Sequence, residues 1–305
     1  MKSGNHNVVK QDKKGLALGQ IFKLFRVHQY IKNLFIFMPL LFSFSFSDVS
    51  NNINTFIAFA LFSLLASSIY IFNDLMDIEE DKAHPIKKNR PLASGKVTKQ
   101  TAQLLIILIS FFVLSTALFI NLNLFAVLFV YFILNIAYSL KLKHISILDI
   151  FIIATGFVLR LFAGSAVTGI ELSMWIIIMT FLLAIFLALA KRRDDVLLSL
   201  AGQETRKNID GYNLEFINAS IVLMAGVVIV SYVQYTISPE VIARLGTEYL
   251  YLTSFFVILG VLRYMQITFV EQNSGSPTKV VIRDTFLKLT IMFWLLSFIG
   301  IAKFI

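Results

Sequence analysis

The chain has 305 residues, of which 57% are hydrophobic and only 15% are charged, and its formal net charge is +9. A soluble domain carries about 45–50% apolar residues, so this composition excludes an ordinary soluble enzyme and indicates an integral membrane protein. The basic residues are scattered among loops, which argues against nucleic acid as a partner, and the lack of cysteine excludes disulfides and thiolate chemistry.

The chain begins with a polar, basic segment, residues 1–28, whose second half (residues 16–28) has the pattern of an amphipathic helix. The remainder, residues 29–305, is expected to form one membrane domain. Nine apolar segments in it are long enough, at roughly 17–25 residues each, to cross a bilayer as helices. Because backbone polar groups in lipid must be satisfied internally, the expected fold is an all-α polytopic bundle of nine transmembrane helices. These segments are residues 30–47, 54–72, 102–121, 123–140, 145–167, 173–190, 214–237, 248–269 and 285–304.

Lysine and arginine are distributed unevenly between the two sets of loops. The N-terminal segment and the loops after the second, fourth, sixth and eighth spans are basic, whereas the alternate loops contain only Arg244. By the positive-inside rule, this alternation predicts a cytoplasmic N-terminus and a C-terminus outside.

The stretch NDLMDIEED, residues 73–81, follows the second span on the cytoplasmic side. Its Asp74, Asp77 and Asp81 are spaced i, i+3 and i+7, which places them on one face of a helix. Three such carboxylates repel one another unless a cation lies between them, and hard oxygen ligands suit Mg²⁺ held together with substrate phosphates. We therefore predict a magnesium–diphosphate site, with Asn73 as a further ligand or a helix cap. A solvated acidic helix end is the alternative.

Further polar residues lie at the same cytoplasmic helix ends. Lys87 and Arg90 belong to the basic run after the aspartates, and Lys191 and Arg192 end the sixth span. Tyr138 lies at the end of the fourth span. It could contact a phosphate or serve as an aromatic anchor at the membrane interface, and the sequence favours neither role.

Two ionisable residues lie inside the fifth span. Asp149 is about one turn into it, and a carboxylate at that depth is costly unless it is paired or solvated, so a role in the site is favoured. Arg160 is eleven residues further on, about 16 Å along the axis, too far to pair with Asp149 along the helix. A functional role and a structural one, by snorkelling or ion pairing, are both open for Arg160.

The segment NDLMDIEEDKAHPIKKNRPLASG, residues 73–95, resembles the first aspartate-rich motif of the UbiA superfamily of intramembrane prenyltransferases. It has the pattern N-D-x-x-D-x-x-x-D followed by basic residues and R-P-L-A-S-G. The segment RVHQYIKN, residues 26–33, is similar to the family's R-x-x-x-W/Y-x-K-N entry to the first span. The resemblance implies that Arg26, Lys32 and Asn33 contact substrate.

Members of that family typically carry a second spaced aspartate series after a later span. At that place this chain reads KRRDD, residues 191–195, with three cations before an aspartate pair. This departure resembles the branch that contains decaprenyl-phosphate phosphoribosyltransferases. Three further features are similar to that branch: the stretch from residue 147 to 164, the A-K-R motif that ends the sixth span, and Arg263-Tyr264 followed by Gly275-x-Pro277 and Arg283-Asp284.

By that resemblance, the enzyme would be a Mg²⁺-dependent glycosyltransferase of the bacterial plasma membrane that serves cell-envelope biosynthesis. It would transfer phosphoribose from phosphoribosyl diphosphate to a polyprenyl phosphate and release diphosphate at the cytoplasmic face. Lys191 and Arg192 would then bind the 5-phosphate, because cations bind phosphate directly. Candidate neighbours of the acceptor phosphate are Lys32, Arg90 and Lys141.

Two other functions are weighed against this one. The first is a prenyltransferase that joins a polyprenyl diphosphate to an aromatic acceptor, although the missing second aspartate series argues against it. The second is a transporter, which would carry ionisable groups near the bilayer midplane. Here the charges gather at one surface, apart from Arg160.

Overall fold

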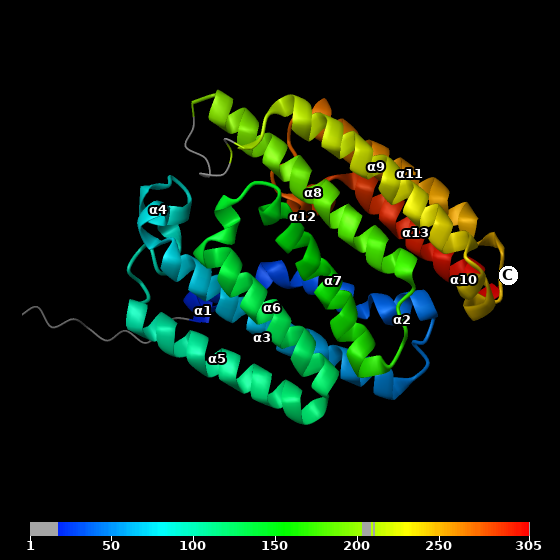
Figure 1. Ribbon diagram of the computed structural model, residues 1–305, viewed down its shortest axis with the longest axis horizontal. Helices are drawn as coiled ribbons and strands as arrows, with labels where there is room; N and C mark the ends of the chain where they lie inside the picture. Colours follow the sequence, from blue (N-terminus) through cyan, green and yellow to red (C-terminus); the bar gives the residue numbers. More distant parts are fainter. Residues whose placement is uncertain (1–17, 203–208, 210, 305) are drawn as a thin grey trace, which may run out of the picture.

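The computed structural model describes residues 18–202, 209 and 211–304, and this part of the chain consists of helices and loops. Eight of its helical segments are long and apolar enough to cross a membrane, and they run side by side in one bundle (Figure 1). The expected all-helical polytopic membrane protein is therefore confirmed. The eight are α3 (Val49–Met76), α5 (Lys99–Ile120), α6 (Leu122–Leu140), α7 (Leu148–Thr168), α8 (Met174–Leu200), α9 (Leu214–Ile237), η5 (Tyr249–Thr253) with α11 (Ser254–Phe269), and α13 (Thr285–Phe304).

The expected first span, residues 30–47, is not among these eight. Its place is taken by the 3₁₀ helix η1 (Val27–Phe37) and the short α2 (Met38–Ser43), which ends where Phe44 adopts a left-handed conformation with φ of 55°. Because a 3₁₀ helix rises about 2.0 Å per residue, η1 and α2 together extend about 31 Å, close to the thickness of the hydrocarbon core. The ninth span and the sides on which the termini lie stay predictions.

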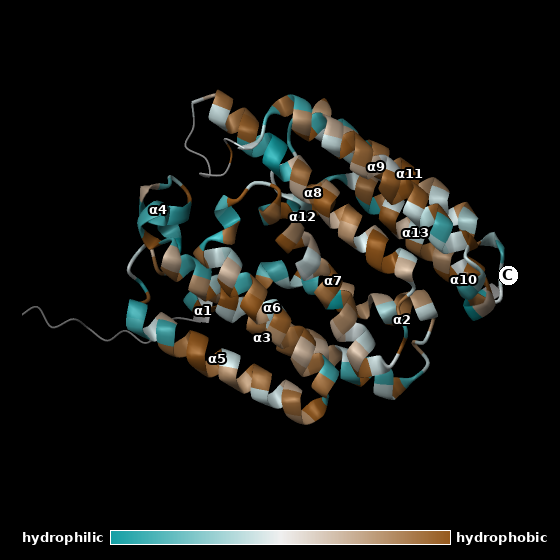
Figure 2. Cartoon of the chain, in the orientation of Figure 1, coloured by the Kyte–Doolittle hydropathy of each residue, from teal (hydrophilic) through white to brown (hydrophobic). Residues whose placement is uncertain are grey.

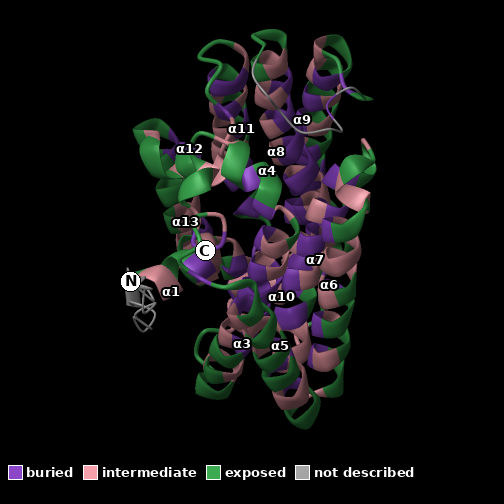
Figure 3. Cartoon of the chain, turned by 90° about the vertical axis from the view of Figure 1, so that its left-hand side faces the viewer, coloured by how far each residue is buried: buried purple, intermediate pink, exposed green. Residues whose placement is uncertain are grey.

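Helix α7 lies at the centre of the bundle and packs against α3, α6, α8 and η1. Gly164 lets η1 approach it, since a Cβ at this position would overlap the backbone carbonyl of Ile36. One apolar core joins α7 to α3, α5 and α6, and a second joins it to α8, α9 and α11. The outer surface is also apolar, as hydropathy and exposure show (Figures 2 and 3), and Phe119 is 89% exposed there. Such a surface is typical of helices that face lipid.

The expected third and fourth spans, α5 and α6, form a tight hairpin. Asn121 is the single residue between α5 and α6, and its side-chain oxygen accepts the amide of Leu124 at 3.0 Å as the N-cap of α6. Its side-chain nitrogen donates to the carbonyl of Ala166 in α7 at 3.1 Å. One residue thus reverses the chain and ties the hairpin to the central helix.

Antiparallel succession brings the polar connections together at one end of the bundle, which we call the charged end. It carries α4 (Ile78–Ala83), η2 (Lys87–Asn89), η3 (Leu142–His144) and α12 (Pro277–Arg283), whereas α10 (Pro239–Leu245) lies at the opposite end (Figure 1). Helix α1 (Leu18–Phe25) forms part of the expected amphipathic segment, whose first two residues lie outside the described residues. Its Leu24 packs with Ile71 and Ile78, which fixes α1 beside the end of α3.

Candidate functional site

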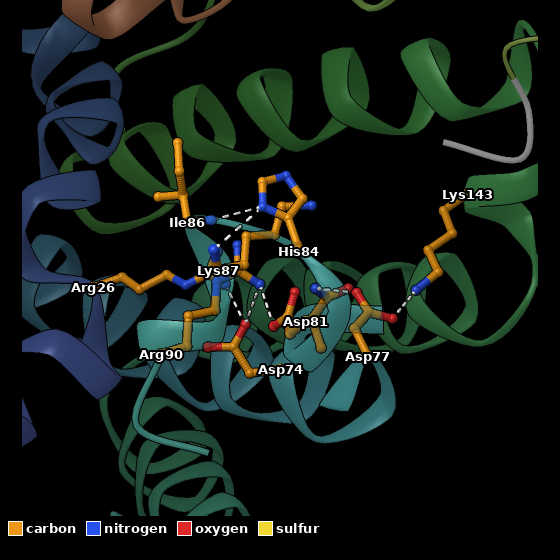
Figure 4. Close-up of polar contacts among 10 residues, drawn as sticks. Arg26, Asp74, Asp77, Asp81, His84, Ile86, Lys87, Arg90 and Lys143 are labelled. Carbon is orange, nitrogen blue, oxygen red and sulfur yellow. Dashed lines mark hydrogen bonds and ion pairs between the residues drawn. The ribbon is translucent and has the colours of Figure 1, made fainter. Parts of the chain in front are cut away.

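The aspartate cluster (Asn73, Asp74, Asp77 and Asp81) spans the junction of α3 and α4. Helix α3 ends at Met76 and α4 begins at Ile78, with Asp77 between them at φ −97° and ψ 11°. The expectation of one continuous helix face is therefore wrong, because the chain bends at Asp77. Helical backbone hydrogen bonds still cross the bend, from Asp77 to Asn73 at 3.0 Å and from Asp81 to Asp77 at 2.8 Å. As a result Asp74 and Asp81 both accept from one guanidinium nitrogen of Arg90, whereas Asp77 accepts from a lysine, Lys143 (Figure 4).

Asp74 and Asp81 converge on a single cationic atom. Nη1 of Arg90 donates to Oδ1 of Asp74 at 3.0 Å and to Oδ2 of Asp81 at 2.7 Å, and Arg26 also pairs with Asp74 (Figure 4). The side chains of both aspartates are 3% exposed or less, whereas those of Arg26 and Arg90 are 19% and 26% exposed. The cluster is thus a pair of buried carboxylates neutralised by arginines that lie in the connecting segments between helices.

Asp77 is held by a residue that sequence reasoning did not assign to the site. Its Oδ1 accepts a hydrogen bond from Nζ of Lys143 in η3, and its Oδ2 accepts one from the side-chain nitrogen of Asn73 at 3.0 Å. In the sequence, Lys143 is notable only as one of the basic loop residues from which the orientation in the membrane is predicted. The predicted Lys141, two residues earlier, is exposed.

The loop that delivers Arg90 is ordered by His84. Its Nδ1 accepts the backbone amides of Ile86 and Lys87 at 3.1 and 3.3 Å (Figure 4). The predicted Lys87 is half-buried in this turn. His84 therefore acts within the loop, where its hydrogen bonds to Ile86 and Lys87 order the segment that carries Arg90 to the carboxylates.

The donor set of the aspartate cluster fits Mg²⁺ that is bound together with a phosphorylated ligand. Among the described residues, no three carboxylate or histidine side chains are arranged to hold a metal ion by themselves. Proteins usually hold Mg²⁺ with one or two carboxylates plus substrate phosphates, however. Asp74 and Asp81 provide such a pair, since one point within hydrogen-bond distance of both is already taken by a cationic nitrogen.

A second group of charges, the arginine network (Asp149, Arg192, Asp195 and Tyr212), joins α7, α8 and the segment before α9. Arg192 is 1% exposed and donates from Nε to Asp149 and from Nη1 to Asp195, each at 2.7 Å. Its Nη2 is buried and has no hydrogen-bond partner among the described residues. A buried guanidinium nitrogen without an acceptor is costly, so this atom is a candidate donor for an anionic ligand.

Tyr212, which sequence reasoning missed, completes the arginine network. Its hydroxyl donates to Oδ1 of Asp149 at 2.7 Å, so both oxygens of this fully buried carboxylate are satisfied. Burial and the hydrogen bond to Asp149 raise the pKa of Tyr212 well above its ordinary value, so the phenol stays protonated and acts as the donor. No feature of the sequence marked this tyrosine, because it is 63 residues from its partner.

The other predicted residues of this region lie around Arg192. Tyr138 is half-buried at the end of α6, within electrostatic reach of Arg192, and Lys191 is half-buried on α8. Arg193 turns away, since it donates to the side chain of Asn218 at 2.9 Å and to the carbonyl of Thr268 at 2.7 Å. Of the three consecutive cations, Arg192 is thus the one that faces Asp149.

Arg160 does not snorkel, since it is buried among α3, α6, α7 and η1. Its donors reach the side chain of Asn33 at 2.8 Å, the carbonyl of Gly156 at 2.6 Å and the hydroxyl of Tyr131 at 3.3 Å. Its guanidinium lies over the rings of Phe62, Tyr131 and Phe157, and no carboxylate in the described part of the chain pairs with it. Of the two structural roles left open by the sequence, neither snorkelling nor an ion pair is seen in the described part of the chain, and Arg160 is held by cation–π contacts and neutral acceptors.

The predicted Asn33 is engaged in the same contacts. It accepts from Arg160 and donates to the hydroxyl of Ser63 at 2.9 Å, which fixes η1 against α3 and α7. Lys32, next to it, is half-buried and lies within electrostatic reach of Arg160 and Arg26. The side chain of Asn33 is thus engaged by Ser63 and Arg160, whereas Lys32 forms no ion pair with a carboxylate in the described part of the chain.

Helices that cross the membrane, with a carboxylate pair and a separate buried arginine at one end, define a membrane protein suited to phosphorylated substrates. The chain belongs to the UbiA prenyltransferase family, whose family model matches residues 36–297. The fold agrees with this assignment. A UbiA homolog from Archaeoglobus fulgidus, solved with GPP and Mg²⁺ bound, has a TM-score of 0.66 at 19% identity, covering 92% of this chain and 99% of that one.

Sequence relatives extend over nearly the whole chain. A decaprenyl-phosphate phosphoribosyltransferase of Mycolicibacterium smegmatis is 30% identical over 295 residues, which are 92% of this chain and 92% of the relative. Another, of Corynebacterium glutamicum, is 28% identical over 94% of this chain and 88% of the relative. A digeranylgeranylglyceryl phosphate synthase of Sulfurisphaera tokodaii is 32% identical, but over only 36% of this chain.

Proposed function

We propose that this protein transfers a 5-phosphoribosyl group from phosphoribosyl diphosphate to a polyprenyl phosphate and releases diphosphate. The observation that carries the proposal is the buried Nη2 of Arg192, which has no partner among the described residues and lies at the place where a prenyltransferase would carry its second aspartate series. A donor with a diphosphate and a separate 5-phosphate needs one acidic, metal-binding site and one basic site. The similarity to two phosphoribosyltransferases over nearly their full length supports the same function.

In this proposal the aspartate cluster binds the diphosphate end of the donor. Asp74 and Asp81, with Asn73 and Asp77 beside them, would hold Mg²⁺, which supplies charge neutralisation to the leaving diphosphate. Arg26 and Arg90 lie at the same carboxylates and are placed to take up phosphate oxygens when they exchange partners. The positive residues around the pair thus serve both the resting site and the bound diphosphate.

The arginine network would bind the other end of the donor. Arg192 donates from Nη2 to the 5-phosphate, with Lys191 and Tyr138 as further candidates around it, whereas Lys87 lies in the loop beside Arg90 and is a candidate for the diphosphate end. An oxygen of the lipid phosphate then attacks the anomeric carbon of ribose, and the bond from that carbon to diphosphate breaks with its electron pair leaving on diphosphate. The attacking phosphate is already anionic at neutral pH, so no general base is required. Catalysis is therefore assigned to positioning and electrostatics.

The acceptor phosphate would approach from the bilayer side. Lys32 lies deeper along η1 than Arg26 and is the candidate for this phosphate, with Arg90 and Lys141 nearer the surface. Residues 29–305 would form one catalytic domain with η1 and α2 as a ninth span. The charged end would then face the cytoplasm, as the distribution of basic loops predicts.

A prenyltransferase that joins a polyprenyl diphosphate to an aromatic acceptor is the second candidate function. It is favoured by the solved UbiA homolog that binds GPP and Mg²⁺ and by the aspartate pair Asp194–Asp195 after the sixth expected span. Against it, Asp195 is paired with Arg192, and Asp194 accepts a hydrogen bond from Ser274 at 2.9 Å. Both carboxylates are thus engaged within the protein.

A transfer assay tests the two functions together. Purified protein in detergent receives ribose-labelled phosphoribosyl diphosphate, Mg²⁺ and a long-chain polyprenyl phosphate, with Asp77→Ala and a chelator as controls. Label that enters the organic phase only with active enzyme and free Mg²⁺ supports the proposal. A parallel reaction contains a labelled prenyl diphosphate and an aromatic acid, and turnover in that reaction alone would establish the prenyltransferase instead.

A further inference from the structure

The turn that leads into α7 contains a strained residue. Ile147 has φ of 70° and ψ of −50°, close to the values of a γ-turn with positive φ, a conformation that is rare and strained. For a β-branched residue such a φ is an outlier. The side chain of Ile147 is 48% exposed, so burial of the side chain does not hold it in place. The conformation must be held through the backbone and its neighbours.

Tyr212 supplies the contact that holds this turn. Its hydroxyl accepts the backbone N–H of Ile147 at 2.7 Å and donates to Asp149 at 2.7 Å, so one side-chain atom bonds both sides of the turn. The residue before it packs equally closely, because a Cβ on Gly211 would overlap the side chain of Ser146. The segment that precedes α9 is thereby clamped onto the segment that precedes α7.

The clamp leads directly to the candidate phosphate donor. Asp149 accepts from Nε of Arg192 through the oxygen that Tyr212 does not use, and Nη2 of the same guanidinium has no partner among the described residues. We infer that Tyr212 is a positioning residue, which keeps Ile147 in its strained turn and thereby aims Asp149 and Arg192 at the 5-phosphate of the donor. This inference rests on the proposed function.

Removal of one hydroxyl tests the inference. In Tyr212→Phe the ring still fills its site while both hydrogen bonds are lost. The exposed Tyr249, which begins η5 shortly after α10, gives the matched control Tyr249→Phe. The expected result for Tyr212→Phe is a rise of about tenfold in the KM for phosphoribosyl diphosphate, with kcat and the KM for the lipid within about twofold, since a hydrogen bond to a charged group contributes at that level. A fall in kcat with an unchanged donor KM would overturn the positioning role.

A glycine at position 147 tests the strain itself. Glycine adopts positive φ without cost, so the turn in Ile147→Gly no longer depends on the clamp. The effect of Tyr212→Phe on the donor KM should therefore shrink to about threefold or less when it is combined with Ile147→Gly. An effect of equal size in both backgrounds would show that Tyr212 does not act through this turn.

Two further measurements separate failure of this inference from failure of the proposed function. Ribose 5-phosphate binding to the wild-type protein, measured by calorimetry, reports on the phosphate site, and amide hydrogen exchange of residues 145–149 reports on the clamp without any ligand. Loss of protection at Ile147 in Tyr212→Phe supports the clamp, and unchanged protection contradicts it. If the wild-type protein neither binds ribose 5-phosphate nor transfers label, the proposed function is wrong and the role of Tyr212 toward Arg192 falls with it.

Discussion

The aspartate cluster and the arginine network lie at the same end of the bundle but are built in opposite ways. In the aspartate cluster Asp74 and Asp81 are buried and Asp77 is half-buried, and their cations come from connecting segments that carry Arg26, Arg90 and Lys143. In the arginine network both members of the central pair, Asp149 and Arg192, are buried on helices α7 and α8. Cations on connecting segments can be exchanged for a ligand at modest cost, whereas a buried pair on helices cannot. The first region is thus suited to an exchangeable metal and leaving group, and the second to a fixed contact.

Asp74→Asn is the change expected to have the largest effect on activity. It removes a charge from the carboxylate pair while the amide still fills the site, so we expect turnover in the label-transfer assay to fall about 10³-fold. Because the partners of Asp74 are partly exposed, the melting temperature should move little. The exposed Glu79, which pairs only with Lys82 in the described structure, gives the acidic control Glu79→Gln. Turnover near the wild-type rate in Asp74→Asn would refute the role of the cluster.

Asp149→Asn should affect stability instead. The substitution leaves the guanidinium of Arg192 buried without the fully buried one of its two charge partners, and breaking a buried pair in this way costs about 3 kcal/mol. Thermal unfolding in detergent measures the loss, and Lys82→Met, which removes an exposed pair, should cost under about 1 kcal/mol. If the two variants melt at similar temperatures, the contrast between the two regions is wrong.

Sequence alone predicted the first region better than the second. The spacing of Asp74, Asp77 and Asp81 and the basic residues after them are local patterns, so the cluster was predicted apart from its bend at Asp77. The arginine network depends on a contact between Asp149 and Tyr212, 63 residues apart, and no local pattern encodes such a contact. Asp149 and Arg192 were each predicted as site residues, but the ion pair between them was not predicted.

The same reasoning explains what was predicted of the fold. Long apolar runs predicted all eight helices of the described structure that are long enough to cross the membrane, because length and hydropathy are local properties. The segment 30–47 was predicted as an ordinary span, and hydropathy could not show that it begins as a 3₁₀ helix. That geometry is fixed by tertiary contacts, from Asn33 to Ser63 and Arg160 and from Tyr30 to Ser67.

A diphosphate ligand should stabilise the folded protein through the aspartate cluster, and this stabilisation should not depend on the arginine network. Mg²⁺ with inorganic diphosphate, at about ten times the dissociation constant, should raise the free energy of unfolding of the wild-type protein by about 1.4 kcal/mol. Asp81→Asn should lose this increment because it removes one of the two converging carboxylates. Asp149→Asn should keep it, although its starting stability is lower. Thermal unfolding with and without the ligand measures the increment in each protein. If both variants lose it, the aspartate cluster and the arginine network form a single binding site.

The smallest effect is expected at a third ion pair, which lies at the charged end but close to its surface. Arg263 pairs with Asp284 at 2.7 Å, and this hydrogen bond lowers the pKa of Asp284 below its ordinary value. A carboxylate whose pKa is lowered in the folded state stabilises the protein above its unfolded pKa, near 4, and this contribution is lost as the pH falls through the lowered value. The pair should therefore matter at neutral pH and vanish in acid.

Asp284→Asn removes the ion pair with Arg263 but keeps the other role of Asp284, which is to cap α13. Oδ1 of Asp284 also accepts the amide of Leu287 at the start of α13, and asparagine caps a helix about as well as aspartate. The free energy of unfolding should therefore fall by under about 1 kcal/mol at pH 7, and the difference from the wild-type protein should shrink below about pH 4 and vanish once the pH is below the lowered pKa of Asp284. Asp284→Ala, which removes the cap as well, should cost about 1 kcal/mol more and keep that difference in acid. A cost as large as that of Asp149→Asn would mean that burial does not set the strength of these pairs, and the distinction between the exchangeable and the fixed region would lose its physical basis.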